Sequence, residues 1–324
     1  MTERIPATVL TGYLGAGKTT LLNRILTGDR GRRYAVIVNE FGEIGIDGDL
    51  IVKADEEFFE MNNGCVCCTV RGDLIRTLHG LLSKGVDFDA ILVETSGLAD
   101  PGPVAQTFFI DHALLARTDL DSITTLVDAK NILAQLTASG VAEEQVAFAD
   151  QIVLNKTELV AEEVLRAIEG RLRALNPLAP IHRAQRSNVP LDRVLRRGGF
   201  DLERIVSLEP DFLDPGLAHD HQHDSEIRSV SLAARVPMDR AKLERWLGEL
   251  VARRGADILR AKGIIDIAGE ERRLVFQAVH MLAEADLQQA WGRDETRRSR
   301  LVFIGRNLDG VALQAGLDAC TAKA

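Results

Sequence analysis

The sequence predicts an α/β fold, with a mostly parallel sheet flanked by helices and a smaller α+β domain at the C-terminal side. Short apolar runs alternate with stretches of helical periodicity over residues 1–206, which is the pattern of βαβ units. A glycine-rich loop lies directly between the first apolar run and the first helical stretch, a context typical of α/β proteins that bind phosphate. At 324 residues the chain is long enough for one large and one smaller domain.

Five short runs rich in Val, Ile and Leu are predicted to be buried strands, and a sixth run would extend the same sheet. The stretches between them have the composition and spacing of helices. The predicted strands are 7–12, 34–40, 90–97, 122–129, 151–156 and 180–185. The predicted helices are 18–28, 69–84, 143–149, 158–175 and a closing helix at 190–198.

The composition changes at residues 207–226, "SLEPDFLDPGLAHDHQHDSE". Two prolines, a glycine, many acidic residues and three histidines are typical of a linker. We therefore expect a first domain at 1–206 and a second at 227–324. The second is predicted to contain a strand at 227–236, a helix at 238–255 that ends at a glycine, and strands within 259–269, 272–282 and 299–308.

Composition excludes several classes of function. The net charge of −9 argues against nucleic acid as the main partner, because phosphate backbones are bound by basic surfaces. The N-terminus does not have the pattern of a signal peptide, and no apolar run reaches the length of about 18 residues that a membrane span needs. Of the four cysteines, three lie within four positions and the fourth is Cys320. A disulfide framework is therefore not expected, and the cytoplasm is the predicted location.

The segment "GYLGAGKT" (12–19) has the spacing G-x-x-x-x-G-K-[ST]. Its glycines would let the backbone turn so that consecutive N–H groups face phosphate oxygens, and the helix that follows adds its positive end. Lys18 would reach the β- and γ-phosphates, and the Thr19 hydroxyl would coordinate Mg²⁺. A glycine-rich turn without a ligand is the alternative. The predicted nucleotide-binding residues here are Gly12, Gly15, Ala16, Gly17, Lys18, Thr19 and Thr20.

Two further segments favour a guanine nucleotide. "NKTE" (155–158) follows an apolar run, at the place where guanine-specific P-loop proteins carry Asn-Lys-x-Asp. Asn155, Lys156 and Glu158 are the predicted base-binding residues, although a polar strand end is the alternative. "ETSG" (94–97) closes another run, where Glu94 could lie beside Mg²⁺ or position water and the Gly97 N–H could sense a γ-phosphate. Lys18, Thr19, Glu94 and Gly97 form the predicted catalytic set.

The segment "NNGCVCCTV" (62–70) places Cys65, Cys67 and Cys68 before a predicted helix whose cap is expected near Thr69. Thiols at a helix N-terminus have a lowered pKa, which favours both soft-metal binding and reactivity. Three sulfurs leave a tetrahedral ion one ligand short, so a carboxylate or an exchange position would complete it. A redox pair and structural packing are the alternatives to this metal site.

At this point the chain resembles the CobW-type family of P-loop GTPases, which is related to the urease and hydrogenase nickel-insertion GTPases. The resemblance covers nearly the whole chain. Its most specific block is "GCVCC" (64–68), and Glu158 stands where the family has Asp. The segments that carry it are "IPATVLTGYLGAGKTTLLN", "VIVNEFGEIGID", "NNGCVCCTVRGDL", "ILVETSGLADP", "VLNKTELV" and, near the C-terminal end, "RAKGIIDIAG", "RLVFQAVHML" and "SRLVFIGRNLD".

The resemblance implies a Mg²⁺-dependent, slow GTPase that binds zinc or cobalt at Cys65, Cys67 and Cys68 and delivers the ion to a client metalloprotein. Glu40 is a plausible further carboxylate near the metal or the nucleotide, and Glu43 is better read as a solvated acid. Asp47 and Asp49 would lie in the first switch. "HDHQH" (219–223) would be either a weak metal collector or a mobile polar linker. The remaining histidines, His79, His112, His182 and His280, are expected to be structural.

Two other functions are alternatives to a metallochaperone. One is an ATP-dependent small-molecule kinase with a structural zinc, which predicts a preference for ATP. The other is a metal buffer or sensor in which the nucleotide only stabilises the fold, which predicts metal binding that does not depend on GTP. The metal chosen in the cell, the client, the residue that positions the attacking water and the oligomeric state, a homo-oligomer included, are left open.

Overall fold

The computed structural model describes residues 4–29, 31–39, 57–61, 67–83, 88–196, 227–292 and 295–322, with the backbone alone at 39, 57–61 and 67–71. The chain divides into two compact units, one formed by residues 1–173 and 179–200 and the other by 174–178 and 201–324. The predicted linker 207–226 lies outside the described residues, so the domain boundaries at 206 and 227 stay predictions.

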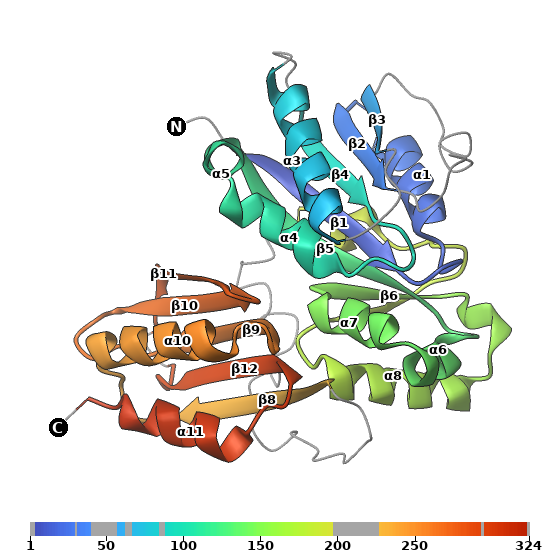
Figure 1. Ribbon diagram of the computed structural model, residues 1–324. Coiled ribbons are helices and arrows are strands. Elements are labelled where there is room, and N and C mark those ends of the chain that lie inside the picture. Colours follow the sequence, from blue (N-terminus) through green and yellow to red (C-terminus); the bar gives the residue numbers. More distant parts are fainter. Residues whose placement is uncertain are drawn as a thin grey trace. The chain divides into compact units, whose positions relative to one another are not determined.

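The first unit contains a seven-stranded sheet in the order β3-β2-β4-β1-β5-β6-β7 (Figure 1). Every neighbouring pair is parallel, as the βαβ pattern predicts. The central strands are buried on both faces, which is why they read as continuous apolar runs. The strands are β1 (Ile5–Gly12), β2 (Tyr34–Asn39), β3 (Glu57–Met61), β4 (Ala90–Glu94), β5 (Thr118–Asp128), β6 (Gln151–Asn155) and β7 (Ile181–Arg183).

Helices connect these strands. They are α1 (Lys18–Gly28), α3 (Cys67–Ser83), α4 (Pro101–Ile110), α5 (His112–Arg117), α6 (Ile132–Ala138), α7 (Gly140–Phe148) and α8 (Glu162–Leu175), with 3-10 helices at Thr157–Leu159 and Leu191–Arg193. The sequence did not predict β3, α4, α5 or α6. The predicted closing helix at 190–198 is wrong in its described residues, which form only the second 3-10 helix and a turn.

The helix α4 begins with "PGP", a sequence that is usually read as a loop. Asp100 caps it by accepting a hydrogen bond from the Gly102 N–H at 2.8 Å. Its prolines lie in the first turn, where backbone N–H groups have no partner within the helix, so the missing donors cost nothing. A local breaker signal is therefore compatible with a helix start.

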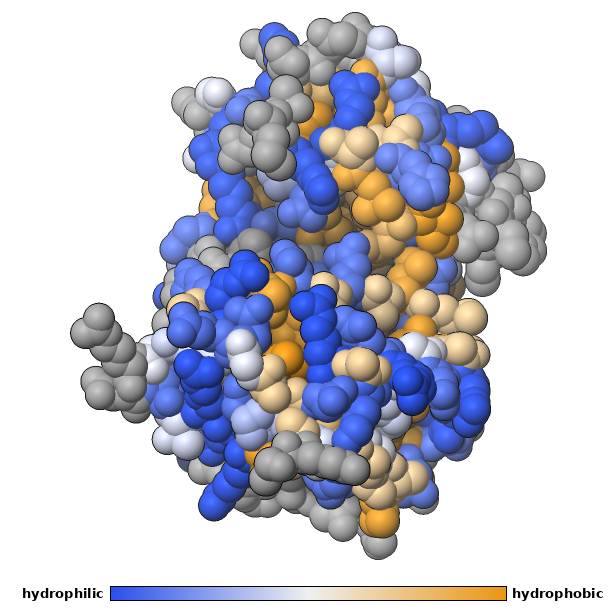
Figure 2. All heavy atoms as spheres, turned by 90° about the vertical axis from the view of Figure 1, so that its left-hand side faces the viewer, coloured by the Kyte–Doolittle hydropathy of each residue, from blue (hydrophilic) through white to orange (hydrophobic). Residues whose placement is uncertain are grey.

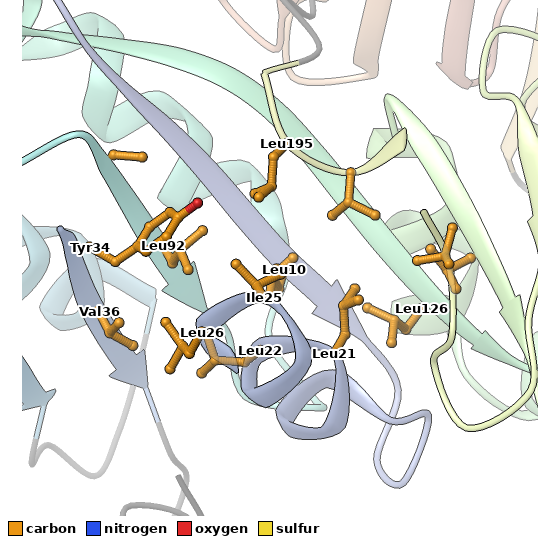
Figure 3. Packing of buried hydrophobic residues seen from close by; sticks show 14 of the residues in the cluster. Leu10, Leu21, Leu22, Ile25, Leu26, Tyr34, Val36, Leu92, Leu126 and Leu195 are labelled. Carbon is orange, nitrogen blue, oxygen red and sulfur yellow. The ribbon is translucent and has the colours of Figure 1, made fainter. Parts of the chain in front are cut away.

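A cluster of apolar side chains fixes α1 against the sheet (Figure 3). Leu21, Leu22, Ile25 and Leu26 form one stripe of the helix, and each is at most 4% exposed. They pack on residues of three adjacent strands, Leu10, Val36 and Leu92. The loop between β1 and α1 is consequently held at both ends by buried contacts.

The second unit is built on a five-stranded antiparallel sheet in the order β11-β10-β9-β12-β8. Two helices lie on the same face of it (Figure 1) and share an apolar core with it. The strands are β8 (Ile227–Ala234), β9 (Ile258–Ile265), β10 (Arg272–Val279), β11 (Leu282–Ala290) and β12 (Ser299–Arg306), and the helices are α10 (Arg240–Arg254) and α11 (Gly310–Ala319). The strand β11 and the helix α11 were not predicted.

On the side that Figure 2 shows, hydrophilic residues cover much of the surface, and apolar residues gather in the upper half of the view. Among the helices of the described residues, none is long and apolar enough to span a membrane.

The contact between α10 and α11 leads to a stability prediction. Gly316 in α11 faces the indole of Trp246 in α10, and a Cβ added there would overlap the ring. Gly248 lies in α10 with open space around its Cα. Replacing glycine by alanine inside a helix normally stabilises by about 0.5–1 kcal/mol, whereas overpacking costs about 1–3 kcal/mol. We expect Gly248→Ala to stabilise the second unit and Gly316→Ala to destabilise it.

Both tryptophans of the chain, Trp246 and Trp291, belong to this unit. Tryptophan fluorescence during urea unfolding therefore reports on this part of the protein. Opposite shifts of the two midpoints are the expected result, and a higher midpoint for Gly316→Ala would contradict the close packing of the two helices.

Candidate nucleotide and metal site

The loop between β1 and α1 has a backbone that only glycine adopts readily. Gly12, Gly15 and Gly17 have φ angles of 135°, 73° and 107°. A Cβ at Gly12 would overlap the carbonyl group of Leu126, and one at Gly17 would approach the amide of Asn155 and the hydroxyl of Ser187. The N-cap residue of α1 is Gly17, which has no side chain with which to cap the helix. The positive end of this helix therefore faces the loop, as in phosphate-binding loops.

Lys18 and Thr19 begin α1 and turn toward the ends of the sheet strands. Lys18 is 8% exposed, and its Nζ donates to the carbonyl oxygens of Gly12 and Tyr13 at 3.0 and 3.4 Å. Thr19 Oγ1 donates to Glu94 Oε1 at 2.8 Å. A hydroxyl and a buried carboxylate thus meet at the carboxyl edge of β4. Two hard oxygen ligands at this place fit Mg²⁺.

The segment after β4 is tied to the loop. The Thr95 N–H donates to the carbonyl oxygen of Leu10 at 3.0 Å, and Thr95 Oγ1 donates to Thr11 Oγ1 at 2.9 Å. Gly97 lies so close to Leu14 that a Cβ would be 2.7 Å from the Leu14 nitrogen. The structure therefore brings the segment that contains the predicted residues Glu94 and Gly97 against the loop between β1 and α1.

Asn155 joins the end of β6 to the same loop. Its Nδ2 donates to the carbonyl oxygen of Ala16 at 2.9 Å, and its Oδ1 accepts from the Ser187 N–H at 2.7 Å. Because Asn155 is 2% exposed, these hydrogen bonds do not compete with water. The side chain acts here as a bridge between separate loops.

Ser187 is a site residue that the sequence reasoning missed. It is fully buried, and its Oγ donates to the carbonyl oxygen of Gly17 at 3.0 Å. Arg186 and Ser187 both lie in the left-handed region, with φ of 48° and 54°, a costly conformation that occurs often at functional sites. The position of Ser187 just after β7 was the one signal available in the sequence, because loops at the carboxyl edges of parallel strands form ligand sites.

The "NKTE" turn is anchored at each of its first three residues. Beyond Asn155, Lys156 Nζ pairs with Asp128 Oδ2 at 2.7 Å, and Thr157 Oγ1 donates to the carbonyl oxygen of Ala184 at 3.1 Å. Lys156 has a φ of 61°, so the chain reverses into the 3-10 helix at this residue. Glu158 is exposed and makes no hydrogen bond or ion pair with the described part of the chain.

The predicted metal ligands are only partly covered. Cys65 and Glu40 lie outside the described residues, as do Glu43, Asp47, Asp49 and the 219–223 histidine segment. Cys67 and Cys68 are the first two residues of α3, so the expected cap near Thr69 is wrong, because the helix starts two residues earlier. Among the described side chains there is no group of three metal ligands. His79 instead pairs with Asp111 at 3.0 Å.

Comparison with known proteins adds to this geometry. Residues 6–183 match the family model described as "CobW/HypB/UreG, nucleotide-binding domain", and residues 227–321 match the "Cobalamin synthesis protein cobW C-terminal domain". The chain belongs to the CobW family. The resemblance read from the sequence and the predicted α/β fold are thus confirmed.

The chain is similar to several curated relatives over nearly its whole length. It is 38% identical to the zinc chaperone YjiA of Escherichia coli, over 96% of this chain and 97% of that protein. It is 36% identical to the zinc chaperone CobW of Pseudomonas aeruginosa, over 96% and 90%. A crystal structure of Zn(II)-bound YjiA GTPase from E. coli superposes with a TM-score of 0.78 at 31% identity, covering 99% of this chain and 100% of that one. A Zn(II)-bound triple mutant of YjiA gives the same TM-score.

The close approach of Gly97 to Leu14 predicts an effect on nucleotide binding. In Gly97→Ala the methyl group would displace the loop backbone, and overpacking of about 1–3 kcal/mol corresponds to a nucleotide affinity about 5- to 150-fold weaker. Gly170 in α8 has open space around it. Gly170→Ala is therefore the matched control and should bind as the wild type does. Titration with GDP followed by calorimetry measures both, and equal affinities would contradict the coupling of the two segments.

Proposed function

We propose that this protein is a GTP-hydrolysing metallochaperone that binds zinc or cobalt at Cys65, Cys67 and Cys68 and passes the ion to a client metalloprotein. The observation that carries the proposal is the network that joins the β1–α1 loop, the segment after Glu94 and the turn after β6. It occurs in a chain 38% identical to a zinc chaperone over 96% of its length. The network supports nucleotide binding, and the relatives support zinc as the cargo.

A guanine nucleotide is supported by the anchoring of the "NKTE" turn. The bonds of Asn155, Lys156 and Thr157 hold the turn, and they leave Glu158 exposed at the carboxyl edge of the sheet. Its carboxylate can accept from both N1–H and the exocyclic amine of guanine. Adenine lacks this pair of donors, so the ATP-dependent kinase is the weaker hypothesis.

The hydrolytic step requires charge compensation around the phosphates. Lys18 would neutralise the β- and γ-phosphates. In the structure its ammonium group donates to two carbonyl oxygens of the loop. Thr19 and Glu94 would hold Mg²⁺, which when bound supplies further compensation of the developing negative charge. The Gly97 N–H would bind a γ-phosphate oxygen. Slow intrinsic turnover is part of the proposal.

A continuous path of contacts supports coupling between nucleotide and metal. Gln145 Nε2 donates to the carbonyl oxygens of Gly97 and Ala99 at 3.2 Å each. The chain that contains Gly97 and Ala99 then enters α4 at the cap formed by Asp100. The helices α4 and α3 lie side by side, as Figure 1 also shows. Because α3 starts at Cys67, a movement near Gly97 can reach two of the three cysteines through two packed helices.

Two polar contacts fasten α3 to the elements that follow α4. His79 Nε2 lies 3.0 Å from the carboxylate of Asp111, and Arg117 Nη1 donates to the carbonyl oxygen of Leu82 at 2.8 Å. The hydrogen bond from His79 and two backbone N–H groups lower the pKa of Asp111. This carboxylate is therefore ionised at neutral pH and can keep its contact with His79.

The coupling is tested by equilibrium titration of Zn²⁺ in the presence of a chelating competitor, with and without a non-hydrolysable GTP analogue. Coupled sites typically differ by 1–3 kcal/mol, so we expect the analogue to raise zinc affinity roughly 5- to 150-fold. By linkage zinc should raise the affinity for the analogue equally. Indistinguishable zinc affinities would favour the metal buffer over the chaperone.

Variants separate the two functions of the protein. The change of Cys65, Cys67 and Cys68 to serine should abolish tight zinc binding and leave GDP affinity nearly unchanged. Lys18→Ala should leave zinc binding intact and remove its response to nucleotide. These titrations also need the chelating competitor, which prevents weaker zinc sites from contributing to the measured binding. A triple mutant of YjiA is itself Zn(II)-bound. Tighter binding of ATP than of GTP would instead support the kinase.

Delivery requires a client protein in the same compartment, for which the cytoplasm is proposed. Affinity capture from metal-starved cells, performed with the wild type and with the triple serine variant, would identify it. A metalloprotein captured by the wild type alone, and in a GTP-dependent manner, is the expected result. Capture that is the same for both proteins would argue against metal delivery.

A further inference from the structure

Asp128 is a buried carboxylate for which none of the sequence motifs gives a role. It is the last residue of β5 and is 2% exposed. The neighbouring strand β6 ends at Asn155, directly opposite Asp128 in the parallel register. Its side chain therefore lies beside the start of the "NKTE" turn.

Three donors hold this carboxylate. Lys156 Nζ donates to Oδ2 at 2.7 Å, Asn131 Nδ2 donates to Oδ2 at 2.9 Å, and the Lys130 N–H donates to Oδ1 at 2.9 Å. Burial raises the pKa of Asp128, but these hydrogen bonds outweigh burial and the net effect is a lowered pKa. The group is consequently an ion at neutral pH and attracts the lysine ammonium.

The lysine has a backbone conformation that needs this support. With φ 61° and ψ 32°, Lys156 lies in the left-handed region, which is unfavourable for a residue with a Cβ. The residues on either side are fixed independently, Asn155 by the β1–α1 loop and Thr157 by Ala184. The ion pair with Asp128 is the contact that fixes the side chain at the reversal itself.

We propose that Asp128 is a positioning residue for guanine recognition. Through Lys156 it fixes the left-handed turn that presents Glu158 to the base, while Asn155 keeps the turn attached to the phosphate-binding loop. The inference rests on the proposed guanine-nucleotide function and adds a residue to it. Removal of the negative charge of Asp128 should therefore affect the contact with the base and leave the phosphate contacts unchanged.

The test compares nucleotides that share phosphates and differ in the base. Dissociation constants for GDP, inosine diphosphate and ADP are measured for the wild type and for Asp128→Asn, which keeps the size of the side chain. GDP binding by the variant should be about 10- to 100-fold weaker, whereas ADP binding should not change. Inosine diphosphate lacks the exocyclic amine and can make only the N1–H contact to Glu158. The substitution should therefore weaken its binding less than it weakens GDP binding.

Asp150→Asn is the matched control. Asp150 precedes the same strand β6 at its opposite end, where Oδ2 accepts from the Ile123 N–H at 2.9 Å. A general loosening of β5 and β6 would appear in this variant too. We expect its ratio of GDP to ADP affinity to equal that of the wild type.

Lys156→Gln provides an independent variant if Asp128→Asn does not fold, because the lysine side chain is 32% exposed. It should lower the preference for GDP over ADP as Asp128→Asn does. The double variant should lose no more than either single variant, since both remove the same contact.

Each outcome decides between the hypotheses. Suppose that the wild type prefers GDP to ADP. The role of Asp128 would then be overturned if Asp128→Asn weakened GDP and ADP binding equally, or if it left GDP binding unchanged. A wild type without preference for GDP over ADP would instead contradict the guanine-nucleotide function itself. The two failures are therefore distinguishable.

Discussion

The hydrogen bond from Asn155 Nδ2 to the carbonyl oxygen of Ala16 connects segments 139 residues apart in the chain. It joins the end of β6 to the phosphate-binding loop, and Ser187 extends the connection to the loop after β7. All three groups are buried, so each bond is protected from water. The site depends on this connection because it lets separate loops hold one ligand with a single geometry.

The parts of the fold that the sequence predicted are those with a local signal. The strands β1, β4 and β6 read as apolar runs because both of their faces are covered, and the spacing of glycines in 12–17 identifies the loop. The helix α4 and the edge strands β3 and β11 have no such signal. In α4 the two prolines lie in the first turn after the cap Asp100, where they do not break the helix. An edge strand such as β11 is exposed along most of its length, which removes the apolar pattern.

The site shows the same limit. Lys18, Thr19, Glu94 and Asn155 were predicted as site residues because each belongs to a short motif with its own chemistry. Ser187 and Asp128 were not, because they act through contacts with residues 32 and 28 positions away, and no local pattern records such pairs. The start of α3 at Cys67 was also beyond local reasoning, since sequence signals locate helix ends only within a few residues.

The position of β3 in the sheet has a consequence for motion. Among the strands of the described residues, β3 pairs with β2 alone, and it precedes the helix that starts at Cys67. The phosphate-binding loop, in contrast, leaves the central strand β1, which pairs on both sides. Separating an outermost strand breaks one ladder, whereas separating an inner one breaks two. Local opening, and with it amide exchange with solvent, should therefore begin on the cysteine-bearing side while the nucleotide cradle stays closed.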